Sequence, residues 1–120
     1  MKRMGNGARI INVSSVSTSW PGADEILYAA SKGALEQLSR VASRALGSRQ
    51  ITVNTVSPGT TDTEFLRTNV PEGVRQTVAR MTPLGRLGRP EDIAAVVAYL
   101  AGADAGWVTG QNIRADGGLV

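Results

Sequence analysis

Tyr28 and Lys32 stand four residues apart in the stretch "YAASK", a short distance behind a serine-rich run at 12–22. Four residues make about one helical turn, so on a helix both side chains project from one face and reach a common ligand. A free phenol ionises at about pH 10, and a neighbouring ammonium group favours its ionised form. The pair predicts a general acid–base unit, whereas the ordinary alternative is a half-buried ring beside a solvated lysine.

Two hydroxyl-bearing segments could serve the same chemistry. Ser15 follows a β-branched run, so its hydroxyl could hold a substrate oxygen against the phenol, although a loop serine that satisfies backbone groups is the plainer explanation. The stretch "SPGTTDT" at 57–63 follows a second such run. Pro58 and Gly59 predict a turn that lets a ligand approach the backbone, with Thr63 just beyond, unless the stretch is only a turn and a helix cap.

Composition removes several function classes. The 120 residues include no histidine and no cysteine, which excludes a Ser-His-Asp hydrolase, disulfides and His- or Cys-ligated metal sites, so we expect no metal. The net charge is +3 and the pI about 10.0, yet arginines and acids alternate without a basic run, so we expect no nucleic-acid partner. No apolar run is long enough to span a membrane, and "MKRMGNGARIINV" is unlike a secretory leader. A cytoplasmic location is the expectation.

The elements expected to position these residues alternate between strand and helix. Strands are predicted at 8–14, 51–57 and 111–115, and helices at 24–47, 72–81 and 89–102. Asp24 and Gly47 are expected to cap the ends of the first helix. That helix is predicted from apolar residues that recur at steps of three and four: Leu27, Ala30, Ala34, Leu38, Val41 and Ala45.

Alternating strands and helices predict an α/β fold with a parallel sheet and helices on its faces. The length suits one domain, so residues 1–120 are taken as a single, partial domain. A three-strand sheet whose first strand opens the chain would leave one edge uncovered. Either the sheet belongs to a larger one, or another chain covers this edge.

Taken together, these stretches closely resemble the C-terminal half of the short-chain dehydrogenase/reductase family, of the classical type. The resemblance covers nearly the whole chain, in the family's order and spacing. It implies three strands of a Rossmann-type, doubly wound parallel sheet with the N-terminal half missing. The stretches that carry it are "GARIINVSS", "YAASKGAL", "ITVNTVSPGTTDT", "PLGRLGRPEDIAAVVAYLAG" and "WVTGQNIRADGG".

The resemblance implies an NAD(P)-dependent oxidoreductase that interconverts alcohols and ketones or aldehydes, in a homo-oligomer. Tyr28 would be the acid–base, Lys32 would favour its ionised form and hold the nicotinamide ribose, and Ser15 would polarise the substrate carbonyl. Asn12 would be structural. The implied cofactor-binding residues are Tyr28, Lys32, Pro58, Gly59, Thr61 and Thr63, and the implied assembly and turn residues are Trp107, Thr109, Gly110, Asp116, Gly117 and Gly118.

Two departures limit what is carried over. Thr61 stands where the family usually has valine or isoleucine, although a main-chain contact survives that change. The Gly-rich phosphate turn, the residue that selects NAD or NADP and the catalytic asparagine are not in this sequence. Because the phosphate turn dominates dinucleotide binding, we expect weak cofactor binding and little activity from this chain alone.

Alternatives to an enzyme remain open. The chain could be a non-catalytic interaction module that associates through the long helix 24–47 and the last strand, and a nucleic-acid binder rests on pI alone. The sequence names neither the substrate nor the choice between NAD and NADP. Side chains in the loop 16–23 and the segment 61–88 could contact substrate or simply pack: Trp20, Phe65, Leu66, Val70 and Met81.

Overall fold

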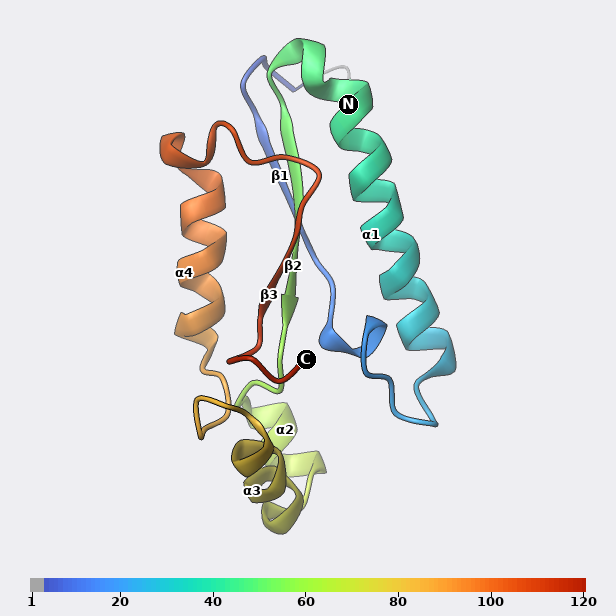
Figure 1. Ribbon diagram of the computed structural model, residues 1–120, viewed down its shortest axis with the longest axis vertical. Coiled ribbons are helices and arrows are strands. Elements are labelled where there is room, and N and C mark those ends of the chain that lie inside the picture. The colour runs from blue at the N-terminus through green and yellow to red at the C-terminus, as the bar shows by residue number, and fades with distance from the viewer. Residues whose placement is uncertain (1–3) are drawn as a thin grey trace.

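The protein is a three-layer α/β/α arrangement in a computed structural model, of which residues 4–120 are described. Three parallel strands, β1 (Arg9–Val13), β2 (Thr52–Pro58) and β3 (Asn112–Ala115), form one sheet in the order β1-β2-β3. The sheet lies between α1 (Ile26–Leu46) and α4 (Pro90–Ala101), which cover opposite faces (Figure 1). The predicted class and the predicted parallel sheet are confirmed.

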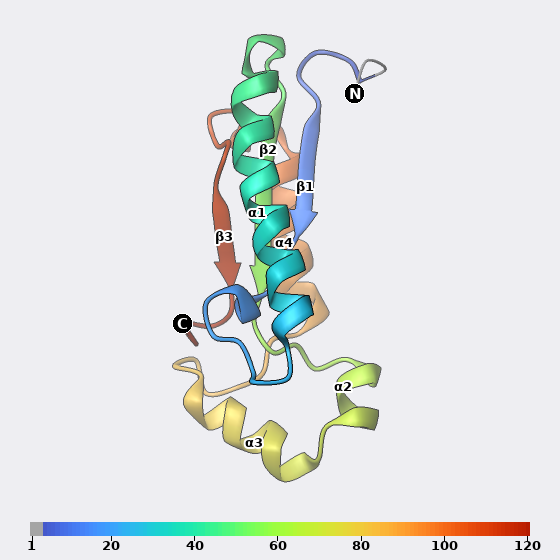
Figure 2. The ribbon, with the colours of Figure 1, turned by 90° about the vertical axis from the view of Figure 1, so that its right-hand side faces the viewer.

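All three strands end at the same edge of the sheet. The register pairs Val13 with Val56 and Pro58 with Ala115, so the loops after β1, β2 and β3 emerge together. Figure 2 shows α2 (Glu64–Asn69) and α3 (Glu72–Met81) beyond this edge, with the N-terminal end of α1 beside it. The bounds of α3 match the prediction, whereas α2 was not predicted.

The outer edge of β1 is uncovered, as the sequence led us to expect. Within residues 4–120, β1 pairs with β2 alone, and β2 occupies the middle of the sheet. None of the helices in the described part of the chain is long and apolar enough to cross a membrane.

The start of α1 departs from the prediction, whereas its end at Gly47 agrees with it. Asp24 does not cap the helix, because Glu25 occupies the N-cap position, and its carboxylate accepts the Gly22 N–H at 2.8 Å. Gly47 does end the helix, but with a right-handed backbone at φ −59°. The chain turns in the left-handed region only at Gln50, at φ 57°.

The start of α4 is fixed by a carboxylate. Pro90 is its first residue, as predicted, and the Arg89 N–H donates to Asp92 Oδ2 at 2.7 Å. The Arg86 guanidinium donates to both oxygens of Asp92, at 2.6 and 3.0 Å. These hydrogen bonds lower the pKa of Asp92 to about 2, and the bond from Arg86 has the largest effect.

The apolar stripe from which α1 was predicted faces away from the sheet. Leu27 is 86% exposed and Val41 66% exposed, and every other member of the stripe is also exposed. The side that faces the sheet is marked instead by polar residues at steps of three and four, followed by a leucine: Lys32, Glu36, Ser39, Ser43 and Leu46. The periodicity predicted the helix correctly, but the side that packs is its more polar one.

Aliphatic packing on the two faces of the sheet is unequal. Under α1, buried Leu46, Ile51 and Val53 form a cluster near the end of the helix. Under α4, a cluster around buried Val56 and Leu100 continues along most of the helix. The α1 interface is therefore apolar near its C-terminal end and polar where the strands end.

The turns after β2 and β3 touch at Gly59. The Gly59 N–H donates to the Ala115 carbonyl at 3.0 Å, and a Cβ added at Gly59 would lie 2.7 Å from the Asp116 Cα. Only glycine permits this approach of the two backbones.

We predict that Gly59→Ala lowers the free energy of unfolding by about 1–3 kcal/mol, because the new methyl group overlaps backbone that cannot move aside. Gly33→Ala is the matched control, since a Cβ at this helical glycine meets nothing within 4 Å. The control should stabilise the protein by up to about 1 kcal/mol. Urea unfolding measures both, and equal effects would contradict the close approach.

Candidate functional site

The candidate site lies where the strands end, beside the first turns of α1. Tyr28 is in the first turn of the helix and is 46% exposed. Ser15 follows β1, and Pro58 closes β2. Parallel strands present their carboxyl ends at one edge, which is where open α/β sheets bind ligands.

Lys32 joins the helix to the end of β1. Its Nζ donates to the Val13 carbonyl at 2.9 Å, two residues before Ser15. The same Nζ lies 5.6 Å from the centre of the Tyr28 ring. The ammonium group is thus held next to the phenol by a backbone oxygen of the strand, and Tyr28, Lys32 and the Ser15 segment share one neighbourhood.

The Ser15 hydroxyl caps the short 3-10 helix η1 (Val16–Thr18). Its Oγ accepts the Ser17 N–H at 3.1 Å and donates to the Ser17 hydroxyl at 3.1 Å. Because a hydroxyl has one proton and can rotate it, Ser15 polarises a carbonyl oxygen only by turning that proton from Ser17 toward the substrate.

The turn after β2 presents mostly backbone. The Thr61 hydroxyl donates to the Gly59 carbonyl at 2.9 Å, and Thr61 forms an isolated bridge with Gly88. Thr63 is the N-cap of α2, and its hydroxyl accepts the Leu66 N–H at 3.3 Å. Thr61 is therefore occupied within its own turn, whereas the Thr63 hydroxyl still has a proton to donate.

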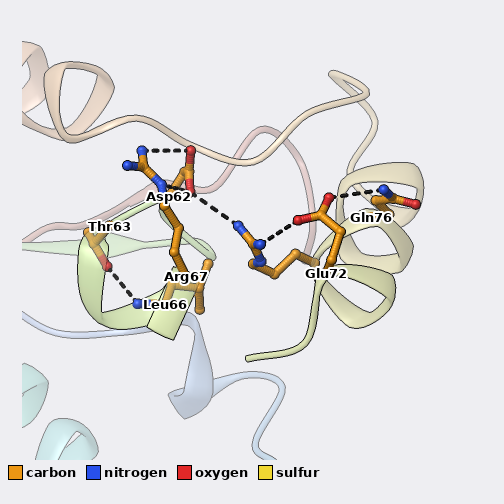
Figure 3. A network of polar contacts seen from close by, with 7 residues as sticks. Asp62, Thr63, Leu66, Arg67, Glu72 and Gln76 are labelled. Atoms are coloured by element: carbon orange, nitrogen blue, oxygen red, sulfur yellow. Dashed lines mark hydrogen bonds and ion pairs between the residues drawn. The ribbon is translucent and has the colours of Figure 1, made fainter. Parts of the chain in front are cut away.

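Asp62 ties the two helices of the segment 61–88 to this turn (Figure 3). It accepts a two-pronged pair of hydrogen bonds from Arg67 of α2, at 2.9 and 3.0 Å, and its Oδ1 lies 3.9 Å from Arg75 Nη1 of α3. Arg75 also pairs with Glu72, which accepts from Gln76 at 2.9 Å. The hydrogen bond from Arg67, with the charges of both arginines, lowers the pKa of Asp62 below its ordinary value.

The residues proposed to contact substrate lie around this edge without forming one wall. Trp20, Phe65 and Met81 are exposed, and Leu66 and Val70 are partly buried. Asn12, interpreted as structural, donates through Nδ2 to the Ser39 hydroxyl of α1 at 2.8 Å. Among residues 4–120, no three His, Cys, Asp or Glu side chains gather where they could hold a metal ion.

Sequence reasoning missed Glu36. Its Oε1 accepts from the Ser14 hydroxyl at 2.7 Å and from the Thr18 hydroxyl at 2.9 Å, so it reaches both sides of Ser15. A usable signal was present, because Lys32 and Glu36 are one turn apart, opposite the apolar stripe. Glu36 would have been found by asking which polar residues lie on the same side of the helix as Tyr28.

Comparison with known proteins relates the whole chain to oxidoreductases. A family profile described as enoyl-(acyl carrier protein) reductase matches residues 1–120. A 3-oxoacyl-(acyl-carrier-protein) reductase from Pseudomonas aeruginosa is 45% identical over 111 residues, which cover 92% of this chain and 44% of the relative.

Two solved structures share the fold. The angucycline C-6 ketoreductase LanV with bound NADP is 46% identical, with a TM-score of 0.89, over 98% of this chain and 46% of that one. A short-chain dehydrogenase/reductase variant from Serratia marcescens is 39% identical, with a TM-score of 0.89, over 98% of this chain and 48% of that one. The chain therefore spans about half the length of the proteins it matches.

We predict that Asp62→Asn weakens the attachment of α2 and α3 and lowers the thermal unfolding midpoint at pH 7. The pKa of Asp62 is lowered from 3.8, so its stabilising contribution is fully present above that pH and is lost as pH falls through the lower, folded-state pKa. The difference between wild type and variant should shrink below pH 3.8. Asp104→Asn, an exposed control in the 3-10 helix after α4, should change little, and a pH-independent difference would contradict the assignment.

Proposed function

Because the chain belongs to the short-chain dehydrogenase/reductase family, we propose that it carries the proton-transfer machinery of an NAD(P)-dependent oxidoreductase that interconverts an alcohol and a ketone or aldehyde. One observation carries this proposal. Lys32 Nζ is bonded to the end of β1 and lies 5.6 Å from the Tyr28 ring, so a cation, a phenol and the Ser15 segment meet at the ligand-binding edge of the sheet.

In the proposed reduction, each side chain has one task. The Ser15 hydroxyl donates a hydrogen bond to the substrate carbonyl oxygen and draws charge onto it. The Tyr28 phenol gives its proton to that oxygen as the alcohol forms, and the Lys32 ammonium stabilises the phenolate left behind. Alcohol oxidation runs the same steps backward, with the phenolate taking the alcohol proton.

The residues present fit one end of a nicotinamide cofactor. When bound, the cofactor supplies or accepts the hydride. Lys32 and Tyr28 offer donors to its ribose hydroxyls, Thr63 has a hydroxyl proton to donate, and Gly59 brings backbone to the site. A structural relative is described with bound NADP. No Gly-rich phosphate turn occurs among these residues, so we propose that tight cofactor binding needs the other half found in the relatives.

A second candidate function, an interaction module, is favoured by the exposed stripe on α1. Its larger members, Leu27, Leu38 and Val41, face away from the sheet, and the free side of α1 is uncovered in Figure 1 and Figure 2. Contiguous apolar surface of this kind marks protein–protein contacts. A chain that keeps this surface could assemble with itself without turning over substrate.

We predict that Tyr28→Phe lowers NADPH-dependent ketone reduction by at least about a hundredfold, because the proton donor is lost and the ring is kept. The assay uses this chain joined behind the N-terminal half of the Pseudomonas aeruginosa reductase, called here the joined protein. Tyr99→Phe, which changes a half-exposed tyrosine of α4, is the matched control. Retained turnover in Tyr28→Phe would remove that phenol from its role.

Calorimetry with NADH and NADPH on the chain alone separates the two candidates only together with the turnover of the joined protein, because undetectable binding without turnover is the result that the interaction module predicts. Micromolar binding would favour an enzyme that is largely complete within these residues. Undetectable binding, together with turnover by the joined protein, is the result expected here.

We predict that the chain alone self-associates and that Val41→Glu shifts it toward monomer, because a charge in the stripe must be desolvated on contact. Val74→Glu is the control, an exposed valine on α3 outside the stripe. Sedimentation velocity over a concentration series measures both. A monomer at every concentration, or equal behaviour of the variants, would remove the interaction candidate.

A further inference from the structure

We propose that Glu36 is a positioning residue that holds the Ser15 segment against α1, in register with Tyr28 and Lys32. This inference rests on the proposed function, because it assigns Glu36 its importance through Ser15. The observation behind it is a single carboxylate oxygen that receives hydroxyls from both sides of that serine.

The hydrogen bonds define the arrangement. Glu36 Oε1 accepts from Ser14 at 2.7 Å and from Thr18 at 2.9 Å. Ser57 Oγ lies 3.3 Å from the same oxygen but only 2.7 Å from Asn112 Oδ1. A serine hydroxyl has one proton, so Ser57 donates to Asn112 by preference, and the two lone pairs of Oε1 serve Ser14 and Thr18.

The donors bracket the catalytic candidate. Ser14 is buried and immediately precedes Ser15, and Thr18 ends the 3-10 helix that Ser15 caps. The Thr18 hydroxyl also lies 3.0 Å from the Ser15 carbonyl oxygen, but its single proton is donated by preference to the nearer, charged Glu36 Oε1 at 2.9 Å. With one end tied to β2 through the Ser14 N–H and Val56 carbonyl, at 2.7 Å, the Ser15 segment is attached to sheet and helix alike.

The spacing along α1 completes the argument. Tyr28, Lys32 and Glu36 follow one another at steps of four, so phenol, ammonium and carboxylate occupy successive turns of one helix face. The ammonium holds the Val13 carbonyl and the carboxylate holds the Ser14 hydroxyl, one residue further on. Hydrogen bonds to an ionised acceptor are about twice as strong as neutral ones, which suits a fixed attachment.

The first arm of the test uses the 120-residue chain as it is. Glu36→Leu should speed amide exchange at Thr18, Ser19 and Trp20, whose N–H groups close η1, by about tenfold or more. The Thr55 amide in the sheet should be unaffected. Glu36→Gln keeps an oxygen acceptor and should stay within about threefold of wild type, which also guards against a Glu36→Leu chain that fails to fold.

Gln37→Leu is the matched control, an exposed neighbour on the same helix, and should leave exchange at residues 18–20 unchanged. Unchanged exchange there in Glu36→Leu would overturn the proposal, because the segment would then be held without the carboxylate. Faster exchange throughout the sheet would equally overturn it, since the effect would be global unfolding.

The second arm uses the joined protein and separates positioning from folding. Glu36→Leu should lower kcat by about tenfold or more while the cofactor KM stays within about threefold, with most of kcat restored in Glu36→Gln. Unchanged kcat beside faster local exchange would overturn the positioning role. If the wild-type joined protein shows no turnover, the proposed function is refuted, and with it the importance of Glu36 for turnover. The exchange result still decides whether Glu36 holds the Ser15 segment against α1.

Discussion

The polar contact between α1 and the carboxyl ends of the strands is the constraint on which the site depends. A helix usually packs on a sheet through aliphatic side chains, and burying charge there is costly unless every charged group finds partners. Here the Lys32 ammonium donates a hydrogen bond to a strand carbonyl, and the Glu36 carboxylate accepts hydrogen bonds from two hydroxyls. These contacts fix the side of the helix that carries the phenol, and apolar packing at Leu46, Ile51 and Val53 holds its far end.

This polarity has consequences elsewhere in the molecule. Since the helix turns its polar side inward, its aliphatic stripe is left on the surface, and the outer edge of β1 is also open within residues 4–120. Both surfaces are of the kind that proteins normally cover. The matched proteins are about twice as long, so we propose that in proteins of that length the other half extends the sheet from β1 and that assembly covers the stripe.

Local sequence patterns predicted most of the framework and only part of the site. β-branched runs gave the strands, and Pro90 with its acidic neighbours gave the start of α4, because these signals act within a few residues. Glu36 was missed because periodicity shows that a helix has two sides without showing which one packs. The six-residue α2 has too few turns for a pattern. The N-cap position of α1 falls on Glu25 and not on Asp24, and Glu25 makes no side-chain capping hydrogen bond, so the expected capping chemistry does not set this helix start.

The central claim is that Ser15 and Tyr28 address the same carbonyl oxygen, with Lys32 behind the phenol. The most direct measurement is a crystal structure of the joined protein with NADP and an unreactive ketone. The account predicts that the Ser15 Oγ and the Tyr28 phenolic oxygen both lie within about 3.2 Å of the ketone oxygen, with Lys32 on the same side. A ketone oxygen that neither hydroxyl reaches, in a complex that retains the α1 contacts described here, would contradict it.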